Sequence, residues 1–455
     1  MSKALSRGCS TGIRRLSCLI TFCASSILQA QDNWPQFRGA DSRGIGLSDR
    51  LPLEWSHEKN VAWHVEILGR GWSSPIIWGD QVFLTAAVSD GDEEAPKKGL
   101  YFGGERAPSK NRHRWLLSCL NRDSGKKLWE AELFAGVPSS SIHVKNSYAS
   151  ETPVTDGKRV YALFGQTGLG CVDFGGKVIW SKTFESRKTQ NGWGTSISPV
   201  LHDNLLIIVR DTEGKSDLIA YDKLTGAELW KIDRDEPTNF ATPYIWRHAQ
   251  RTELVVPGRR QVRSYSLDGK LLWWFKGMST ITIPTPFEAE GLLYLCAGYV
   301  GDKVNPNKPV YAVRPGGAGD LALKDGERQN QFIAWMEPNA APYNPSALVY
   351  EGRFYVLWDF GFFSARDAKT GAELYEKQRI KTDGTVGFTS SPWAYRDRVF
   401  CLSEDGDTYV IKAGDRYQLE RLNSLGEMCM ATPAIAGDRL FIRTTSGLWC
   451  IRSAE

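Results

Sequence analysis

The most constraining feature of this chain is an eight-fold repeat. Each copy has a small or polar residue, then proline, then a short β-rich apolar run. The eight pairs are Ser74-Pro75, Thr152-Pro153, Ser198-Pro199, Thr242-Pro243, Thr285-Pro286, Asn344-Pro345, Ser391-Pro392 and Thr432-Pro433. Subtracting successive proline numbers gives steps of 78, 46, 44, 43, 59, 47 and 41 residues. A unit of that length predicts a β-propeller, in which every repeat is one four-stranded blade.

The sequence inside each repeat agrees with a blade. An apolar strand, a Gly/Asp turn and an alternating strand follow the proline, as in "VTDGKRVYALFG" after Pro153. A third strand and a second turn then lead to an aromatic residue, as in "DKLTGAELW" (Asp222–Trp230) and "DAKTGAELY" (Asp367–Tyr375). The Asp and Gly favour a tight turn. We expect the aromatic side chain on the fourth strand to pack between neighbouring blades.

The two ends of the repeat region predict how the ring closes. Three strands follow Pro433, whereas an isolated strand, Val61–Ile67, precedes the first repeat and carries Trp63 where other units have theirs. We therefore predict an all-β, eight-bladed propeller of four-stranded antiparallel blades, closed by pairing of this N-terminal strand with the last blade. Seven blades are the alternative, if the Pro286 unit is only a decorated loop.

Residues 1–30 have the pattern of a secretory signal peptide. Basic residues precede the apolar segment Leu16–Leu28, and Ala30 offers a cleavage site. We therefore expect a periplasmic or secreted protein, and no later segment is apolar for long enough to span a bilayer. All four excess positive charges of the chain lie in residues 1–30, so the remainder is near neutral and lacks the basic footprint of a nucleic-acid-binding protein.

The remaining chain divides into an irregular segment and the repeat array. Residues 31–60 have little periodicity and are expected to lie across the ring, and residues 61–455 form the propeller domain, which we expect to be monomeric. Two polar stretches, Asp90–Arg114 and Gly301–Gln331, are predicted surface insertions that shape a binding face. Six cysteines follow residue 30, and we expect them to be small core residues without an essential disulfide.

Candidate site residues come from the segments that enter the first strand of each blade, because these approach the central channel. They are Trp72, His143, Lys145, Asn146, Tyr148, Trp193, Phe240 and Phe388. An aromatic rim with a few polar groups suits a flat or sugar-like ligand. The alternative is that these aromatic side chains only plug the channel mouth. Glu151 is a weak candidate for a catalytic base. No histidine, cysteine or carboxylate spacing predicts a metal site.

The Asp-x-x-Thr-Gly-x-x-x-Trp units resemble the pyrroloquinoline quinone (PQQ) repeat, shared by quinoprotein dehydrogenases and BamB-like propellers. The opening "NWPQFRGADSRGIG" (Asn33–Gly46) is similar to the start of secreted PQQ-like repeat proteins. The resemblance to the dehydrogenases implies PQQ beneath a disulfide of adjacent cysteines and above a calcium ion, but this chain has no adjacent cysteines. We therefore expect no cofactor, and a non-catalytic module that binds a protein or saccharide partner at one face. The alternatives are a PQQ-dependent oxidoreductase of alcohols or sugars that uses calcium, and, less favoured, a hydrolase or lyase.

Overall fold

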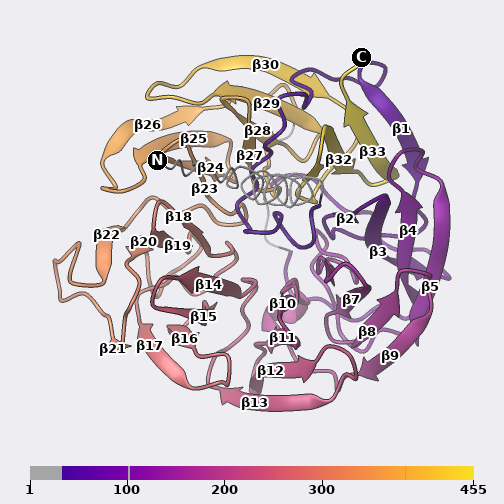
Figure 1. Ribbon diagram of the computed structural model, residues 1–455, viewed down its shortest axis with the longest axis horizontal. Helices are drawn as coiled ribbons and strands as arrows, with labels where there is room; N and C mark the ends of the chain where they lie inside the picture. The colour runs from indigo at the N-terminus through magenta and orange to yellow at the C-terminus, as the bar shows by residue number, and fades with distance from the viewer. Residues whose placement is uncertain (1–32, 101–102, 385, 455) are drawn as a thin grey trace, which may run out of the picture.

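The computed structural model describes residues 33–100, 103–384 and 386–454, so the predicted signal peptide and its cleavage site lie outside the described residues. The strands form eight sheets arranged as blades around a central axis (Figure 1). Eight blades are thus confirmed, and the Pro286 unit is a true blade. Within the described ranges, no helix is long and apolar enough to cross a membrane.

The blades follow one another along the chain, each with its first strand nearest the axis. Blades one and two consist of β2 (Ile76–Trp78), β3 (Gln81–Ser89), β4 (His113–Asn121), β5 (Lys127–Gly136), β6 (Val154–Thr155), β7 (Arg159–Phe164), β8 (Gly168–Asp173) and β9 (Val178–Thr183). Blades three and four consist of β10 (Val200–His202), β11 (Leu205–Arg210), β12 (Ser216–Asp222), β13 (Glu228–Arg234), β14 (Tyr244–His248), β15 (Arg251–Val256), β16 (Val262–Tyr265) and β17 (Leu271–Phe275). A short 3-10 helix, η1 (Gln190–Gly192), precedes blade three.

The second half of the ring repeats this order. Blades five and six consist of β18 (Phe287–Ala289), β19 (Leu292–Cys296), β20 (Val310–Val313), β22 (Ile333–Glu337), β23 (Leu348–Tyr350), β24 (Arg353–Trp358), β25 (Phe362–Asp367) and β26 (Glu373–Arg379). Blades seven and eight consist of β27 (Trp393–Tyr395), β28 (Arg398–Leu402), β29 (Asp407–Lys412), β30 (Leu419–Ser424), β31 (Ala434–Ala436), β32 (Arg439–Arg443), β33 (Gly447–Arg452) and β1 (Val61–Glu66). A two-residue strand of the second insertion, β21 (Gly319–Asp320), pairs in parallel with β17 and extends blade four.

The ring closes as the sequence predicts. Strand β1 pairs antiparallel with β33, with Trp63 opposite Cys450 and His64 opposite Trp449. In Figure 1 this places the first strand of the chain beside the last one at the rim. Trp63 is buried, and its indole Nε1 donates a hydrogen bond of 2.9 Å to the carbonyl oxygen of Arg122 in blade one. The closing strand therefore joins blade eight to blade one.

The same contact recurs around the ring and explains the repeat motif. The indole on the fourth strand of one blade donates to a backbone carbonyl in the last turn of the next blade. Examples are Trp129 to Phe174 at 2.8 Å, Trp180 to Lys223 at 3.2 Å, Trp230 to Leu267 at 3.0 Å and Trp335 to Ala368 at 2.9 Å. The motif glycine lies beneath this indole: a Cβ at Gly226 would lie 2.9 Å from the Trp180 ring, and its φ is +71°. Glycine is required there both for the turn and for the approach of the indole.

Trp273 departs from the expected pattern of indoles that bridge two blades. Its indole Nε1 donates a hydrogen bond of 3.0 Å to Glu253 within its own blade.

The N-terminal segment lies across one face of the ring, as expected. Trp34 pairs with Ile77 of blade one, and Ile45 forms a bridge with Ala394 of blade seven. Leu51 and Trp55 are buried in the core shared by blades seven and eight. Because Gly79, in the turn between β2 and β3, donates its N–H to Asn33, this face carries the turns between first and second strands. We call it the plug face.

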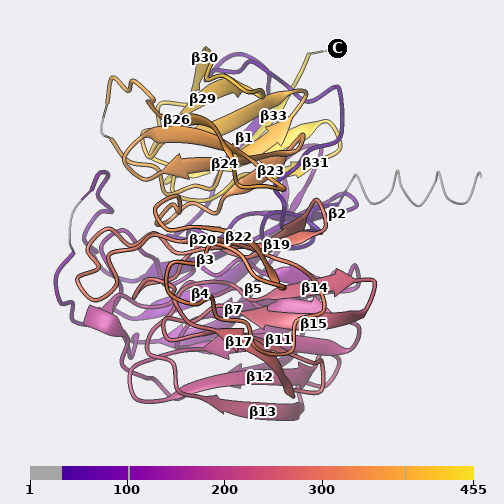
Figure 2. The ribbon, with the colours of Figure 1, turned by 90° about the vertical axis from the view of Figure 1, so that its left-hand side faces the viewer.

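The opposite face carries the connections between blades and those between second and third strands. The first insertion, between β3 and β4, belongs to it, and so does η1. Figure 2 shows the ring from the side, with the purple insertion and η1 at the left. We call this the insertion face.

Candidate functional site: a cavity on the propeller axis

A cavity of about 540 Å³ lies at the axis of the ring. Each blade contributes one hydroxyl-bearing side chain from the start of its first strand. These residues are Ser74, Thr152, Ser198, Thr242, Thr285, Ser346, Ser391 and Thr432. The repeated motif before each blade therefore builds a polar collar around a single space.

Six hydrogen bonds connect this hydroxyl collar from blade to blade. In each, a backbone N–H donates to the hydroxyl oxygen of the next blade. The bonds run from Ser74 to Thr152, Thr152 to Ser198, Ser198 to Thr242, Thr285 to Ser346, Ser346 to Ser391 and Ser391 to Thr432, at 2.9 to 3.1 Å. A hydroxyl that accepts such a bond still has its own hydrogen to donate. The collar can therefore present donors as well as acceptors to a ligand.

Blade six corrects one element of the sequence interpretation. The repeat there predicts Asn344, before Pro345, as the equivalent residue, but the collar position is taken by Ser346, two residues later. Asn344 also lines the cavity, and its N–H donates to Asp359 at 2.9 Å. Ser346 lies two residues before β23, as Ser74 lies two residues before β2, so the hydroxyl keeps its place relative to the first strand and the proline of blade six is displaced.

One wall of the cavity is aromatic. Trp193 and Phe240 form a cluster with Ile281, and Tyr299 and Tyr343 pack against it. The rings of Tyr299 and Tyr343 are 5.1 Å apart between centroids. Trp72 lines the cavity from the start of blade one. Trp72, Trp193 and Phe240 were expected at this mouth from sequence, whereas Tyr299 and Tyr343 were not.

His143, Lys145 and Asn146, also expected from sequence, lie together beside this wall. The His143 ring packs edge-on against Trp193 with centroids 5.4 Å apart, and its Nδ1 accepts the N–H of Lys145 at 3.1 Å. Burial, then the nearby Lys145 and Arg106 cations, lower the pKa of His143 to about 4, so its imidazole is neutral at physiological pH. Asn146 Nδ2 donates to the carbonyl oxygen of Trp193 at 2.9 Å and so fixes the aromatic wall.

Lys145 is part of a charge pair that sequence reasoning missed. Its ammonium contacts Glu404 Oε1 at 2.5 Å and donates to the carbonyl oxygen of Gly99 at 2.9 Å. Glu404 is 1% exposed and also accepts from Thr389 Oγ1 at 2.6 Å. The run "EDGDT" (Glu404–Thr408) begins at a hairpin turn, as the sequence indicates, but its first carboxylate points to a lysine from another blade. No local pattern connects residues 259 positions apart.

Three candidates lie away from the cavity. Tyr148 packs against Trp115 in the core of blades one and two and donates to the carbonyl oxygen of Ser140. Phe388, which was expected at the channel mouth, has no exposed surface and lies in the core between blades six and seven. Glu151 is buried behind the collar and accepts a hydrogen bond of 2.6 Å from Thr195 Oγ1. Burial raises its pKa to about 7, against the opposing Thr195 bond.

The two ends of the cavity are closed by different parts of the chain. On the insertion face, Lys98 pairs with Asp405 at 2.5 Å and Gly99 donates its N–H to Glu404 at 2.8 Å, so the first insertion reaches blade seven. Trp193 Nε1 donates to the carbonyl oxygen of Gly104 at 3.0 Å. Phe37 of the N-terminal segment lines the other end. The insertion therefore forms part of the cavity wall.

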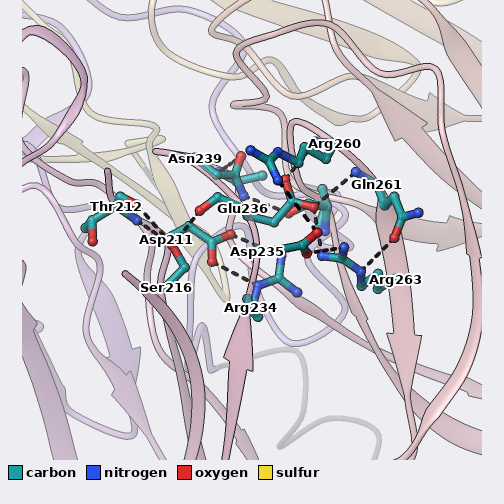
Figure 3. Close-up of polar contacts among 12 residues, drawn as sticks. Asp211, Thr212, Ser216, Arg234, Asp235, Glu236, Asn239, Arg260, Gln261 and Arg263 are labelled. Carbon is teal, nitrogen blue, oxygen red and sulfur yellow. Dashed lines mark hydrogen bonds and ion pairs between the residues drawn. The ribbon is translucent and has the colours of Figure 1, made fainter. Parts of the chain in front are cut away.

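A buried ionic network holds the segment that carries Phe240 (Figure 3). Arg234 makes two bonds to the carboxylate of Asp211, at 2.9 and 3.1 Å. Glu236, in the connection between blades three and four, accepts from Arg263 Nη1 at 2.8 Å and from the N–H of Arg260 at 2.7 Å. These bonds satisfy charges that would otherwise be costly to bury. They fix the backbone that leads into the aromatic wall.

The carboxylates near the axis do not form the metal set that the resemblance to quinoprotein dehydrogenases implies. Asp359 lines the cavity but accepts the N–H groups of Tyr343 and Asn344, and burial raises its pKa to about 6. Glu404 is paired with Lys145, and Glu151 is bonded to Thr195. Among the described residues, no three His, Cys, Asp or Glu side chains are grouped to hold a metal ion. A calcium ion takes six to eight oxygen ligands, so the residues present do not fit a calcium-supported quinone site.

The cysteines likewise do not provide the adjacent pair of that class. Cys119, Cys171, Cys296, Cys401, Cys429 and Cys450 are all free and buried. Burial raises the pKa of the Cys119 and Cys171 thiols to about 12. These side chains therefore act as apolar core residues.

Comparisons with known proteins agree with this architecture. The sequence matches the family described as outer membrane protein assembly factor BamB over residues 113–274 and 216–455. A search of curated proteins gave no match. Among solved structures, BamB from Moraxella catarrhalis is similar with a TM-score of 0.53 and 12% identity over 78% of this chain and 98% of that chain.

Two quinoprotein enzymes share the fold as well. Quinohemoprotein alcohol dehydrogenase from Comamonas testosteroni is similar with a TM-score of 0.58 and 11% identity, over 95% of this chain and 83% of that one. A europium-containing methanol dehydrogenase has a TM-score of 0.57 and 10% identity, over 93% and 92%. At these identities the similarity concerns the fold alone.

Proposed function

We propose that this chain, which belongs to the outer membrane protein assembly factor BamB family of PQQ-like propellers, is a secreted or periplasmic, non-catalytic binding protein. In this proposal the axial cavity holds a neutral saccharide. The observation that carries this proposal is the composition of the cavity. An aromatic wall formed by Trp193, Phe240, Tyr299 and Tyr343 lies beside a collar of eight hydroxyl side chains.

The chemistry of this wall suits a sugar ring. Aromatic faces cover the C–H face of a sugar, while hydroxyl side chains can exchange donors and acceptors with its hydroxyl groups. The volume of about 540 Å³ is in the range of small-molecule sites and suits a mono- or disaccharide. Lys145 is paired with Glu404, and the buried carboxyl of Asp359 accepts two backbone N–H groups. A neutral ligand is therefore favoured over a charged one.

A binding role is favoured over an enzymatic one by the state of the carboxylates. A general base must reach the proton that it abstracts. Glu151 lies behind the collar and is bonded to Thr195, while Asp359 is held by two backbone N–H groups. Neither is arranged with a histidine or a second carboxylate as an acid–base pair.

The proposal is tested by calorimetric titration of the protein from residue 31 onward with a panel of neutral mono- and disaccharides. We expect one class to bind, and Trp193→Ala and Phe240→Ala to weaken that binding at least tenfold. Tyr148→Phe is the matched control, because Tyr148 belongs to the same polar segment but lies outside the cavity. A panel without any binding sugar, or equal loss in the control, would overturn the proposal.

A parallel arm tests the oxidoreductase alternative. The same preparation is mixed with PQQ and calcium, and dye reduction is measured with alcohols and aldoses. We expect no turnover above the protein-free mixture. Turnover that Glu151→Gln abolishes would favour the enzyme.

A protein partner is a second candidate function, which the family membership favours. The family description names an assembly factor of outer membrane proteins. In that case a partner from the outer-membrane assembly apparatus would bind the insertion face. Affinity capture with Lys98→Glu as the disrupted variant and Lys126→Glu as a matched exposed control distinguishes the two roles. Loss of capture in the first variant alone supports a protein partner, and loss in neither contradicts it.

A further inference from the structure

A second cavity, of about 390 Å³, lies between blades eight and one on the insertion face. Its walls come from the connection between β1 and β2, from the start of the first insertion and from the end of β32. Trp72 lines both this cavity and the axial one. The second cavity is therefore a neighbour of the axial site with a different set of wall residues.

The distinctive group in this cavity is a buried guanidinium. Arg443, the last residue of β32, lines the cavity and is only 2% exposed. Its Nη1 donates to Ser73 Oγ at 2.7 Å and to the Ser73 carbonyl oxygen at 3.3 Å. Among the described residues, no carboxylate forms an ion pair with it, and burial lowers the pKa of Arg443 to about 9. A buried cation without a counter-ion is energetically unfavourable.

The other buried arginines differ from Arg443 in their partners or their position. Arg234 is paired with buried Asp211, and Arg263 is paired with buried Glu236. Arg38 and Arg210 also lack an ion pair within the described residues, but they line neither of these two cavities, and each donates from Nη2 to a backbone carbonyl oxygen. Among these arginines, Arg443 is the one without an ion pair that lines one of the two cavities.

The guanidinium packs closely against the chain at Gly71, which also lines the cavity. A Cβ at that position would lie 2.5 Å from both Arg443 Nη2 and the Thr85 carbonyl oxygen. Glycine at this position therefore allows the backbone to approach Arg443. In addition, the nearby indole Nε1 of Trp72 is buried without a hydrogen-bond partner within the described structure. A buried N–H without an acceptor is unfavourable, so a ligand that accepts a hydrogen bond there would be stabilised.

The other charged groups of the cavity wall do not pair with Arg443. Glu93 accepts from Ser109 Oγ at 2.6 Å and contacts His113 Nε2 at 3.2 Å. Arg70 is half-buried, and the carboxylates of Glu93 and Glu94 act on it. Asp92 is exposed. The lining therefore holds two arginines and two carboxylates, but neither carboxylate forms an ion pair with Arg443.

We propose that this cavity binds a small monocarboxylate, whose carboxylate pairs with the Arg443 guanidinium. Guanidinium and carboxylate match in geometry and form charge-assisted, often bidentate, hydrogen bonds. A single negative charge balances Arg443. A phosphate dianion would carry excess charge next to Glu93 and Asp92, and is therefore disfavoured. The site shares Trp72 with the axial cavity, but Arg443 lines the second cavity and not the axial one.

The test uses sodium acetate as the probe, with sodium chloride and sodium phosphate at equal ionic strength as references. Melting temperature and the line width of ¹³C-labelled acetate are measured for the protein from residue 31 onward. We expect a saturable rise in melting temperature with acetate alone and broadening of the acetate signal by the protein. Arg443→Met is expected to abolish both effects, whereas Arg38→Met, the matched buried arginine, leaves them unchanged.

Arg443→Lys keeps the experiment decisive if Arg443→Met does not fold. It preserves the charge but loses the forked donor geometry, so acetate affinity should fall about tenfold. An acetate response equal to that of chloride, a phosphate response equal to or above that of acetate, or full acetate affinity in Arg443→Lys would each overturn the proposal.

Discussion

The two faces of the ring differ in which residues cover the blades. On the plug face, residues outside the repeat cover the blades: Trp34, Leu51 and Trp55 are buried against blades one, seven and eight. On the insertion face, the repeat presents its hydroxyl collar to a cavity, and an insertion reaches across to Glu404. The contrast shows that the chain packs apolar side chains against the blades on one face and places polar groups around the cavity on the other.

We expect the largest loss of unfolding free energy from a substitution on the plug face. Trp55→Ala removes an indole that is 2% exposed and packs with Phe400. We expect the free energy of unfolding to fall by about 3–5 kcal/mol, as in other truncations of buried aromatic residues. Urea denaturation followed by circular dichroism measures this. Saccharide affinity in the folded fraction should not change, and a variant of normal stability would contradict the assignment of this face as a packed core.

A pH-dependent effect should come from the insertion face. The folded-state pKa of Glu151 is raised from 4.5 to about 7 by burial, so the folded protein favours the neutral carboxyl. The contribution of the neutral Glu151 carboxyl to stability is complete below pH 4.5 and is lost as pH rises toward 7. Relative to Glu151→Gln, the wild type should therefore lose about 3 kcal/mol of unfolding free energy across this window. Parallel pH profiles of the two proteins would contradict the assignment.

A substitution in the hydroxyl collar should lower stability less than the two changes above. Thr242 Oγ1 accepts the N–H of Ser198 at 3.1 Å, and Thr242→Val keeps the shape but removes this acceptor. Leaving a buried N–H unsatisfied costs about 1–3 kcal/mol. Thermal melting of Thr242→Val, with Thr225→Val in an exposed turn as the comparison, measures the difference. Equal melting temperatures would show that the collar does not stabilise the ring.

The smallest change in stability should come from breaking the ion pair that joins the first insertion to blade seven. The ammonium of Lys98 is partly exposed where it pairs with Asp405. An exposed pair contributes about 0–1 kcal/mol, so Lys98→Ala should leave the denaturation midpoint nearly unchanged. A fall as large as that of Trp55→Ala would mean that the insertion is part of the fold and not an addition to it.

The repeat fold could be predicted because its signals are local. The prolines mark the blade starts, and each Asp-Gly turn is followed by the indole that joins two blades, as in Trp180 with Gly226. The irregular N-terminal segment was placed correctly across the ring. Its partners could not be named, since Trp55 packs against residues more than 300 positions away.

The site was predicted only in part, and side-chain direction explains why. Successive residues of an extended chain point to opposite sides. Trp72 and Phe240 lie two residues before Ser74 and Thr242 and face the channel with them. Phe388 lies three residues before Ser391 and points into the core instead. Trp193 reaches the channel through η1, to which this alternation does not apply. Glu404 and Asp359 follow second strands, Arg443 is the last residue of one, and none of the three carries a repeat signal.

The most direct test of the central claim is hydrogen–deuterium exchange with and without the tightest-binding neutral saccharide of the panel. If the ligand occupies the axial cavity, exchange should slow in residues 190–194 and 238–241 on the insertion face, and residues 40–60 of the plug face should not change. Protection confined to the plug face or to the outer strands β9 and β13, or no protection at all, would contradict a saccharide site at the axis.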